Sequence, residues 1–214
     1  MRQCAPALAG SPGRPRMSNA EISHSAPGGM PGFGQLTLAT PRLVLRPLQE
    51  SDAPALLAIF SDPKVMRYWS TPPWESIDAA NEMIARDRKA MAEGQDLRLG
   101  LERAEDKALI GVCSLFDRSQ QCRRAEVGYG LASQAWGHAY MDEALRALLR
   151  YGFSELALNR VEADIDPRNE ASARSLERLG FKKEGHLRER WIVAGEVSDT
   201  ALYGLLSRDW HWRA

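Results

Sequence analysis

The spacing of apolar residues changes several times along the chain, and each change marks a predicted element. Apolar and polar residues alternate over 42–48, 97–102 and 160–166, which predicts half-buried strands. A nearly continuous apolar run over 108–116 predicts a hairpin partner for the second of these strands. Residues 138–156 carry apolar side chains three and four positions apart, which predicts the longest helix. The remaining predicted elements are strands over 124–131, 185–193 and 199–206 and helices over 52–61, 76–93 and 169–179.

The order of these elements predicts the fold class. It runs strand, helix, helix, three strands, helix, strand, helix and two strands. Strands mixed with strand–helix units predict an α/β (α+β) domain with a mixed sheet and helices on both faces. Residues 1–35 are instead rich in Gly, Pro, Ala and Ser and have no hydrophobic period, so we expect a disordered tail before one domain over 36–214.

Composition and charge exclude several classes of function. The chain has 214 residues, of which 44% are hydrophobic and 26% charged, as in soluble globular proteins. Its 28 Lys and Arg balance 28 Asp and Glu, so no overall charge attracts nucleic acid or a membrane surface. No apolar run approaches the ~18 residues of a membrane span. Cys4, Cys113 and Cys122 form no paired motif, so we expect neither disulfides nor a metal site, and a cytoplasmic location.

The strand over 124–131 leads through a glycine-containing loop into the long helix. A helix N-terminus exposes N–H groups and the positive end of the helix dipole, which together favour an anion. Gly137 and Ala139 are small enough for a pyrophosphate to approach their backbone. An ordinary strand–helix turn, in which the glycine only permits a sharp bend, has the same local pattern.

Residues 134–139, Gln-Ala-Trp-Gly-His-Ala, resemble the Gln/Arg-x-x-Gly-x-Gly/Ala loop of the GNAT acetyltransferases. Further blocks in the same order are similar to the RimJ/RimL-like branch, the ribosomal-protein N-terminal acetyltransferases and their relatives. The resemblance covers about residues 40–209. Its other blocks are residues 40–48, 126–129, 169–172, 176–181, 184–188 and 195–199.

The resemblance implies the GNAT fold and acetyl-CoA as co-substrate, without a metal. In that fold a mixed, mostly antiparallel sheet of about seven strands has helices on both faces. Its fourth and fifth strands, here 124–131 and 160–166, splay apart around the pantetheine arm. The acetyl group passes to a primary amine of a protein N-terminus or a small molecule, in a ternary complex. The residues implied in cofactor binding are Leu131, Ala132, Gln134, Trp136, Gly137, His138, Ala139, Tyr140, Met141, Asn169 and Ser172.

One carboxylate and two serines are candidates for proton transfer. Glu126 shares a strand face with two glycines and is our candidate base, since an α-amine, with an ordinary pKa of roughly 7.7–8.0, needs only a weak one. An ion pair with a neighbouring arginine is the alternative role of Glu126. Leu176 stands where many GNAT members have a tyrosine that protonates the leaving thiolate. Ser172 is therefore the candidate donor, with Ser175 as a second, and small-residue packing is the alternative for both.

The aromatic loop after the first predicted helix contains Tyr68, Trp69 and Trp74. The resemblance places this loop over the acceptor, so these residues are candidate acceptor contacts, and core filling is their alternative role. Two other functions remain open at this point. One is an acyltransferase with another acyl-CoA or an antibiotic or polyamine acceptor, and the other is a non-catalytic acyl-CoA-binding module. The expected partner is an amine, with no nucleic acid or membrane, and the chain is expected to be a monomer or homodimer.

Overall fold

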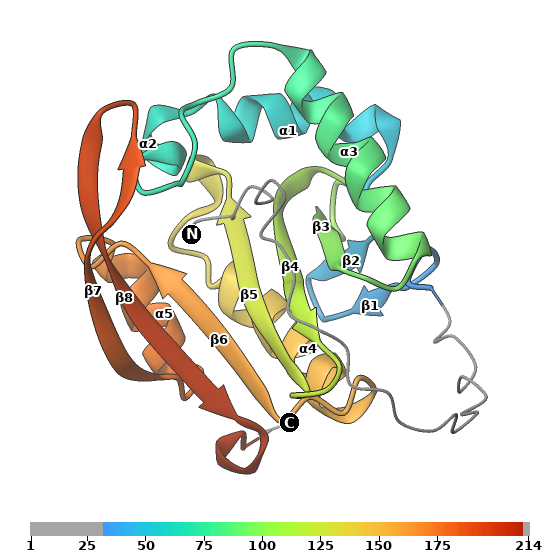
Figure 1. The fold of residues 1–214 in the computed structure, drawn as a ribbon. Coiled ribbons are helices and arrows are strands. Elements are labelled where there is room, and N and C mark those ends of the chain that lie inside the picture. Colours follow the sequence, from blue (N-terminus) through green and yellow to red (C-terminus); the bar gives the residue numbers. More distant parts are fainter. Residues whose placement is uncertain (1–31, 212–214) are drawn as a thin grey trace, which may run out of the picture.

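The computed structural model describes residues 32–211, which form one mixed sheet with helices on both faces (Figure 1). Its eight strands lie in the order β1-β2-β3-β4-β5-β6-β8-β7, and every neighbouring pair is antiparallel except β5 and β6. This confirms the predicted fold class. The observed sheet has one strand more than the predicted sheet of about seven, namely the two-residue strand β1. The strands are β1 Leu38–Ala39, β2 Leu43–Arg46, β3 Leu97–Arg103, β4 Leu109–Ser119, β5 Arg124–Leu131, β6 Arg160–Ile165, β7 Lys182–Val193 and β8 Glu196–Leu206.

The helices divide between the two faces of the sheet. A Cβ on Gly130 would meet Phe60 of α1, whereas the next residue back along β5, Tyr129, bonds to Ser172 of α5. Because successive side chains of a strand point to opposite faces, α1 and α5 cover opposite faces. In Figure 1, α4 and α5 lie behind the sheet. The α-helices are α1 Ala53–Phe60, α2 Pro63–Met66, α3 Ile77–Ala92, α4 Tyr140–Ser154 and α5 Glu170–Arg178.

The sheet splays between β5 and β6. These parallel strands pair only at Arg124–Arg160, Ala125–Val161 and Glu126–Glu162, whereas β5 continues to Leu131. Beyond the last of these pairs, β5 has no neighbour in the sheet on its β6 side. The predicted separation of the strands over 124–131 and 160–166, the fourth and fifth predicted strands, is confirmed.

Helix α4 begins two residues later than the predicted start at 138. Ala139 has a left-handed backbone, with φ 58° and ψ 16°, so the helix cannot include it and starts at Tyr140. The predicted stripe then packs on the sheet as expected. The buried residues of α4 are Ala144, Leu145, Ala147, Leu148, Leu149 and Gly152.

The hairpin of β7 and β8 is longer than the sequence predicts. Its turn consists of Ala194 and Gly195, with φ 48° and 83°. Two successive left-handed residues match the twist of the flanking strands, so the ladder continues up to the turn. The pairing reaches Val193 and Glu196, beyond the predicted start at 199.

The domain begins before the predicted boundary at residue 36. Phe33 is only 3% exposed, and its N–H donates to the Met91 carbonyl at 2.7 Å. A buried phenyl ring stabilises this segment in spite of the surrounding glycines, so 32–35 do not belong to a disordered tail. The rest of the predicted tail, 1–31, lies outside the described residues. Within residues 32–211, no helix has the length and apolar character needed to cross a membrane.

Candidate active site

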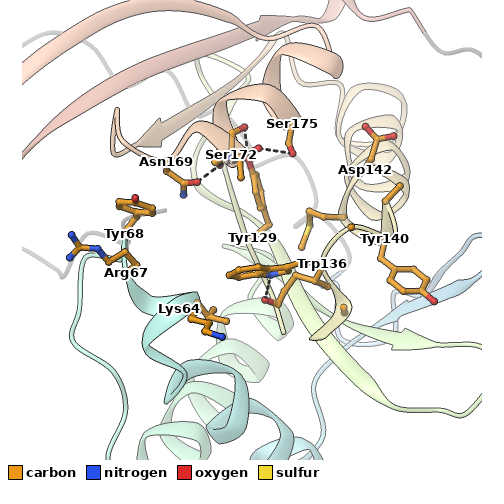
Figure 2. Close-up of a pocket in the computed structure, with 18 of the residues that line it drawn as sticks. Lys64, Arg67, Tyr68, Tyr129, Trp136, Tyr140, Asp142, Asn169, Ser172 and Ser175 are labelled. Carbon is orange, nitrogen blue, oxygen red and sulfur yellow. Dashed lines mark hydrogen bonds between the residues drawn. The ribbon is translucent and has the colours of Figure 1, made fainter. Parts of the chain in front are cut away.

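A cavity of about 950 Å³ lies between the end of β5, the start of α4, the start of α5 and the region of α2. Figure 2 shows side chains from these elements around it. β5 and β6 have separated at this level, so the cavity lies where the sheet is open. One cavity thus joins the loop predicted to bind the cofactor with the loop predicted to cover the acceptor.

The loop between β5 and α4 turns on two residues with left-handed backbone angles. Gly137 has φ 80°, and Ala139 is the N-cap of α4. Alanine has no oxygen with which to cap a helix, and no side-chain capping bond is present here. The first N–H groups of α4 therefore have no acceptor within the helix. Nothing lies within 4 Å of where a Cβ on Gly137 would stand, which leaves room for an anion at this backbone.

Side chains of the same loop fold back onto its own backbone. The indole N–H of Trp136 donates to the Leu131 carbonyl at 2.9 Å. Nδ1 of His138 lies 2.9 Å from the Trp136 carbonyl, and the His138 ring stacks on Tyr140 at 5.7 Å between centroids. These contacts hold the loop in shape without using the N–H groups of the first turn of α4.

The end of β5 has one paired edge and one open edge. The N–H of Ala132 donates to the Ile110 carbonyl at 2.8 Å, toward β4, and the Ala132 side chain is buried. Ala132 therefore has no N–H to offer a cofactor, contrary to the prediction. Successive N–H groups of a strand point to opposite edges, so the N–H of Leu131 points to the side that β6 has left.

Two hydroxyl groups meet at the wall of the cavity formed by α5. The Tyr129 hydroxyl and Oγ of Ser172 lie 2.6 Å apart. Burial raises the pKa of Tyr129 to about 12, so its hydroxyl keeps its proton. Asn169 caps α5 by accepting from the Ser172 N–H at 3.1 Å, and it also lines the cavity (Figure 2). The Ser175 hydroxyl is bonded to the Ala171 carbonyl, which leaves Ser172 as the better placed of the two serines.

Glu126 lies at the apex of the splay, in the last pair of β5 and β6. Burial, reinforced by the negative charge of Asp164, raises the pKa of Glu126 to about 8. Asp117 and Glu162 add to this effect, and Arg124 opposes it. Glu126 does not line the cavity. Any exchange of protons with a molecule in the cavity must therefore pass through an intermediate such as water.

Three segments meet at the α2 side of the cavity. Arg67 and Arg168 each lie 5.8 Å from the ring centroid of Tyr68. Both arginines also bind Glu196 at the start of β8, Arg168 at 2.6 Å and Arg67 at 3.4 Å. Arg168 is held in turn by the buried carboxylate of Asp166 at 2.6 Å. The ring of Tyr68 thus lies near two cations that share one carboxylate.

The two tryptophans of the aromatic loop differ in their access to the cavity. Trp69 lines it, and its ring packs edge-on against Phe60 and beneath Gly130. Trp74 packs on Phe60 as well, at 4.6 Å between centroids, but does not line the cavity. Trp74 therefore has the core-filling role, contrary to the predicted acceptor contact.

Charged side chains gather on the opposite side of the cavity, between α4 and α5. Asp142 accepts from Arg146 at 2.8 Å and lies 3.9 Å from Arg178. Two cations thus share one anion, and this side keeps an excess of positive charge. Among the described residues, His, Cys, Asp and Glu side chains do not group in threes that could hold a metal ion.

A family model described as an acetyltransferase (GNAT) domain matches residues 42–182, well over half of the chain. The chain belongs to the GNAT acetyltransferases. This acetyltransferase is 37% identical to the N-acetyltransferase p20 of Bacillus licheniformis over 174 residues, which are 81% of this chain and 98% of that protein.

Two further relatives place the acetyltransferase within its family. It is 27% identical to the [ribosomal protein uS5]-alanine N-acetyltransferase of Escherichia coli (strain K12) over 185 residues, 82% of this chain and 93% of that protein. It also resembles the crystal structure of spermidine N-acetyltransferase from Vibrio cholerae in complex with CoA and spermine. The TM-score is 0.71 at 26% identity, over 79% of this chain and 98% of that chain. The predicted RimJ/RimL-like branch is confirmed.

The cavity of the acetyltransferase brings together most of the residues predicted from the sequence. Gln134 and His138 are exposed and do not line it, and neither do Glu126, Trp74 and Ala132. The predicted residues that line it are Tyr68, Trp69, Leu131, Trp136, Gly137, Ala139, Tyr140, Met141, Asn169 and Ser172.

The sequence prediction omits several lining residues of this acetyltransferase. Tyr129 carries a usable signal, since the alternation along β5 places it on the face opposite Glu126, where α5 packs. Leu176 stands where many family members carry a tyrosine. In this chain the hydroxyl of Tyr129 lies beside Ser172. Arg67 and Arg178 carry no local signal, because a single exposed arginine is common on any helix or loop.

Proposed function

We propose that this GNAT enzyme moves an acetyl group from acetyl-CoA to a primary amine, with a protein N-terminal α-amine as the acceptor class. The observation that carries this proposal is the single cavity from the uncapped start of α4, past the Tyr129–Ser172 pair, to the region of α2. When bound, acetyl-CoA supplies the acetyl group as a thioester. The residues of the chain bind it, orient it and move protons.

The uncapped N–H groups from Gly137 to Met141 would bind the pyrophosphate, since a helix N-terminus favours anions. Arg146 and Arg178 lie on the same side of the cavity and would offset the remaining phosphate charge. The open edge of β5 at Leu131 offers the N–H that the pantetheine amides need. The Vibrio cholerae relative, whose crystal structure contains CoA, supports this ligand.

The Ser172 hydroxyl would protonate the leaving sulfur as it takes a proton from the Tyr129 hydroxyl, which would regain its proton from water. A thiol has an ordinary pKa near 8.5, so a weak donor is enough. Glu126, in its ionised form, would receive the proton of the amine through water, and this form becomes common only as the pH approaches its pKa of about 8. That pKa is close to the roughly 7.7–8.0 of an α-amine, so transfer between the two groups costs little free energy.

The charges near α2 favour an N-terminal α-amine over a polyamine. Lys64 and Arg67 line this side, and Arg168 lies beside Tyr68, whereas Glu196 and Asp166, the carboxylates that bind these arginines, do not line the cavity. A polycation would be repelled by such a surface, whereas a peptide offers a single amine and several acceptor carbonyls.

A two-stage experiment tests the proposal. Thermal unfolding is first followed with and without acetyl-CoA, and thiol release is then measured with Ala- and Ser-starting peptides, spermidine and an aminoglycoside. We expect stabilisation by acetyl-CoA and thiol release with the peptides. Stabilisation without turnover on any amine would instead identify a binding module, and turnover on spermidine alone would contradict the proposed acceptor.

A further inference from the structure

Arg42 lies just before β2, outside the cavity, and contacts the cofactor loop from behind. Its Nη1 donates to the carbonyl oxygen of His138 at 3.0 Å, across 96 positions of sequence. Its guanidinium also lies 4.7 Å from the ring centroid of Tyr140. Arg42 is not among the residues that line the cavity, whereas Ala139 and Tyr140 are.

The carbonyl that Arg42 holds belongs to the peptide between His138 and Ala139. In a planar trans peptide, the C=O and the following N–H point in opposite directions. If the oxygen of His138 is held toward Arg42, the N–H of Ala139 is directed away from Arg42, toward the cavity. The residues on either side of His138, Gly137 and Ala139, both have left-handed backbone angles, so the local chain alone does not determine which way this peptide faces.

A second contact of Arg42 neutralises a carboxylate in the first turn of α4. Glu143 accepts from Nε of Arg42 at 2.7 Å and from its backbone N–H at 2.9 Å. The Thr40 hydroxyl donates to the same carboxylate at 2.6 Å. Burial opposes ionisation, but these hydrogen bonds outweigh it and lower the pKa of Glu143. The ionised Glu143 therefore anchors Arg42 and ties the strand β2 to the start of α4.

We propose that Arg42 is a positioning residue that orients the His138–Ala139 peptide so that its N–H faces the cofactor pyrophosphate. Glu143 fixes the position of the guanidinium group, and the guanidinium group fixes the orientation of the peptide. The inference rests on the proposed function, because it takes the loop as the pyrophosphate site. It assigns to a residue outside the cavity a role that acts only on the phosphate-bearing part of the co-substrate.

The test compares two acetyl donors in the Arg42→Met variant. Acetyl-CoA carries the pyrophosphate, whereas S-acetylpantetheine carries the same thioester without any phosphate. We expect kcat/KM for acetyl-CoA to fall about tenfold or more, through KM rather than kcat, as the loss of one charge-assisted hydrogen bond and its geometry implies. The kcat/KM for S-acetylpantetheine should stay within about twofold of wild type. An equal loss with both donors, or no loss with acetyl-CoA, would overturn the proposal.

Glu143→Gln separates peptide orientation from charge. If Arg42 acted only by neutralising Glu143, Arg42→Met would cost nothing further in the Glu143→Gln background. The amide oxygen of Gln can still accept from Nε of Arg42 and keep the guanidinium in place, so we expect the loss specific to acetyl-CoA to persist there, and its disappearance would contradict the proposed role. Arg88→Met removes a more exposed ion pair, with Glu50, whose two residues do not line the cavity, and should leave both donors unaffected. If the wild-type protein does not use acetyl-CoA at all, the proposed function fails rather than the role of Arg42.

Discussion

The two ends of the cavity differ in the kind of chemical group that they present. At the α4 end, the groups that we propose bind the phosphates are mainly backbone N–H groups with Arg146 and Arg178 beside them, and Arg42, outside the cavity, bonds to Glu143 and the His138 carbonyl. At the α2 end, the corresponding groups are side chains, with Arg67 and Arg168 meeting over Tyr68. Figure 2 shows Arg67 and Tyr68 across the cavity from Tyr140 and Asp142.

This difference explains how one fold could keep the same cofactor site while its acceptor site changes. Backbone groups do not depend on residue type, so the α4 end tolerates substitution as long as the loop keeps its shape. The ion pairs of Glu196 are half-exposed, and such pairs contribute only ~0–1 kcal/mol to stability. We therefore expect the α2 end to be replaceable at little cost to folding, whereas damage to the α4 end removes the co-substrate.

Gly137→Trp should give the largest effect, because it places an indole where the phosphates are expected. We expect affinity for CoA to fall by about 100-fold or more, equivalent to ~2.7 kcal/mol, as measured by calorimetry. Gly195→Trp is a matched control at the hairpin turn. Gly195 has a similar φ of 83° and equally open surroundings, so this variant bears the same backbone strain. Equal losses of CoA affinity in the two variants would show that strain, rather than the position of Gly137, is responsible.

The hydroxyl pair of Tyr129 and Ser172, between the two ends of the cavity, should affect the chemical step. It should not affect the binding of acetyl-CoA or of the acceptor. Ser172→Ala should lower kcat by about tenfold to 100-fold, at the low end for a general acid because a thiolate leaves easily. Tyr129→Phe keeps the ring in place and should lower kcat less. Steady-state kinetics would check both variants, with KM for acetyl-CoA expected to remain unchanged. A change in that KM without a change in kcat would assign the pair to cofactor binding instead.

The ionisation of Glu126 should make the free energy of unfolding depend on pH, independently of either end of the cavity. Its pKa of about 8 lies above the 4.5 of an unperturbed glutamate, so the folded state keeps a proton that the unfolded state releases. The free energy of unfolding should therefore fall as pH rises between these two values, with a slope below about 1.4 kcal/mol per pH unit, and then level off. Urea unfolding of wild type and Glu126→Gln measures this. The variant should lack the slope, and parallel curves would contradict the raised pKa.

Glu196→Gln should give the smallest effect and the one most confined to the α2 end. Loss of the shared carboxylate frees Arg67, while Asp166 still holds Arg168, so KM for the peptide acceptor should rise by about threefold, in keeping with an exposed ion pair. KM for acetyl-CoA and the melting temperature should not change. A larger effect on acetyl-CoA than on the peptide would remove the distinction between the two ends.

The same contrast explains how far the sequence could be interpreted. The strand, loop and helix around Gly137 follow one another in the chain, so their local pattern predicts most of the residues that line this end of the cavity. Tyr68, Arg168 and Glu196 lie in three separate segments, and only the folded chain brings them together. Trp74 and Ala132 are wrongly predicted because sequence does not reveal whether a side chain faces the core, or whether an N–H is already used in the sheet. Phe33 is missed because its glycine-rich surroundings conceal one buried ring.

The central claim is that the start of α4 binds the two phosphates of the co-substrate. A crystal structure of the protein with coenzyme A tests it most directly. We predict pyrophosphate oxygens within hydrogen-bonding distance of the N–H groups between Gly137 and Met141. Phosphates bound at another surface, with this loop empty, would contradict the account.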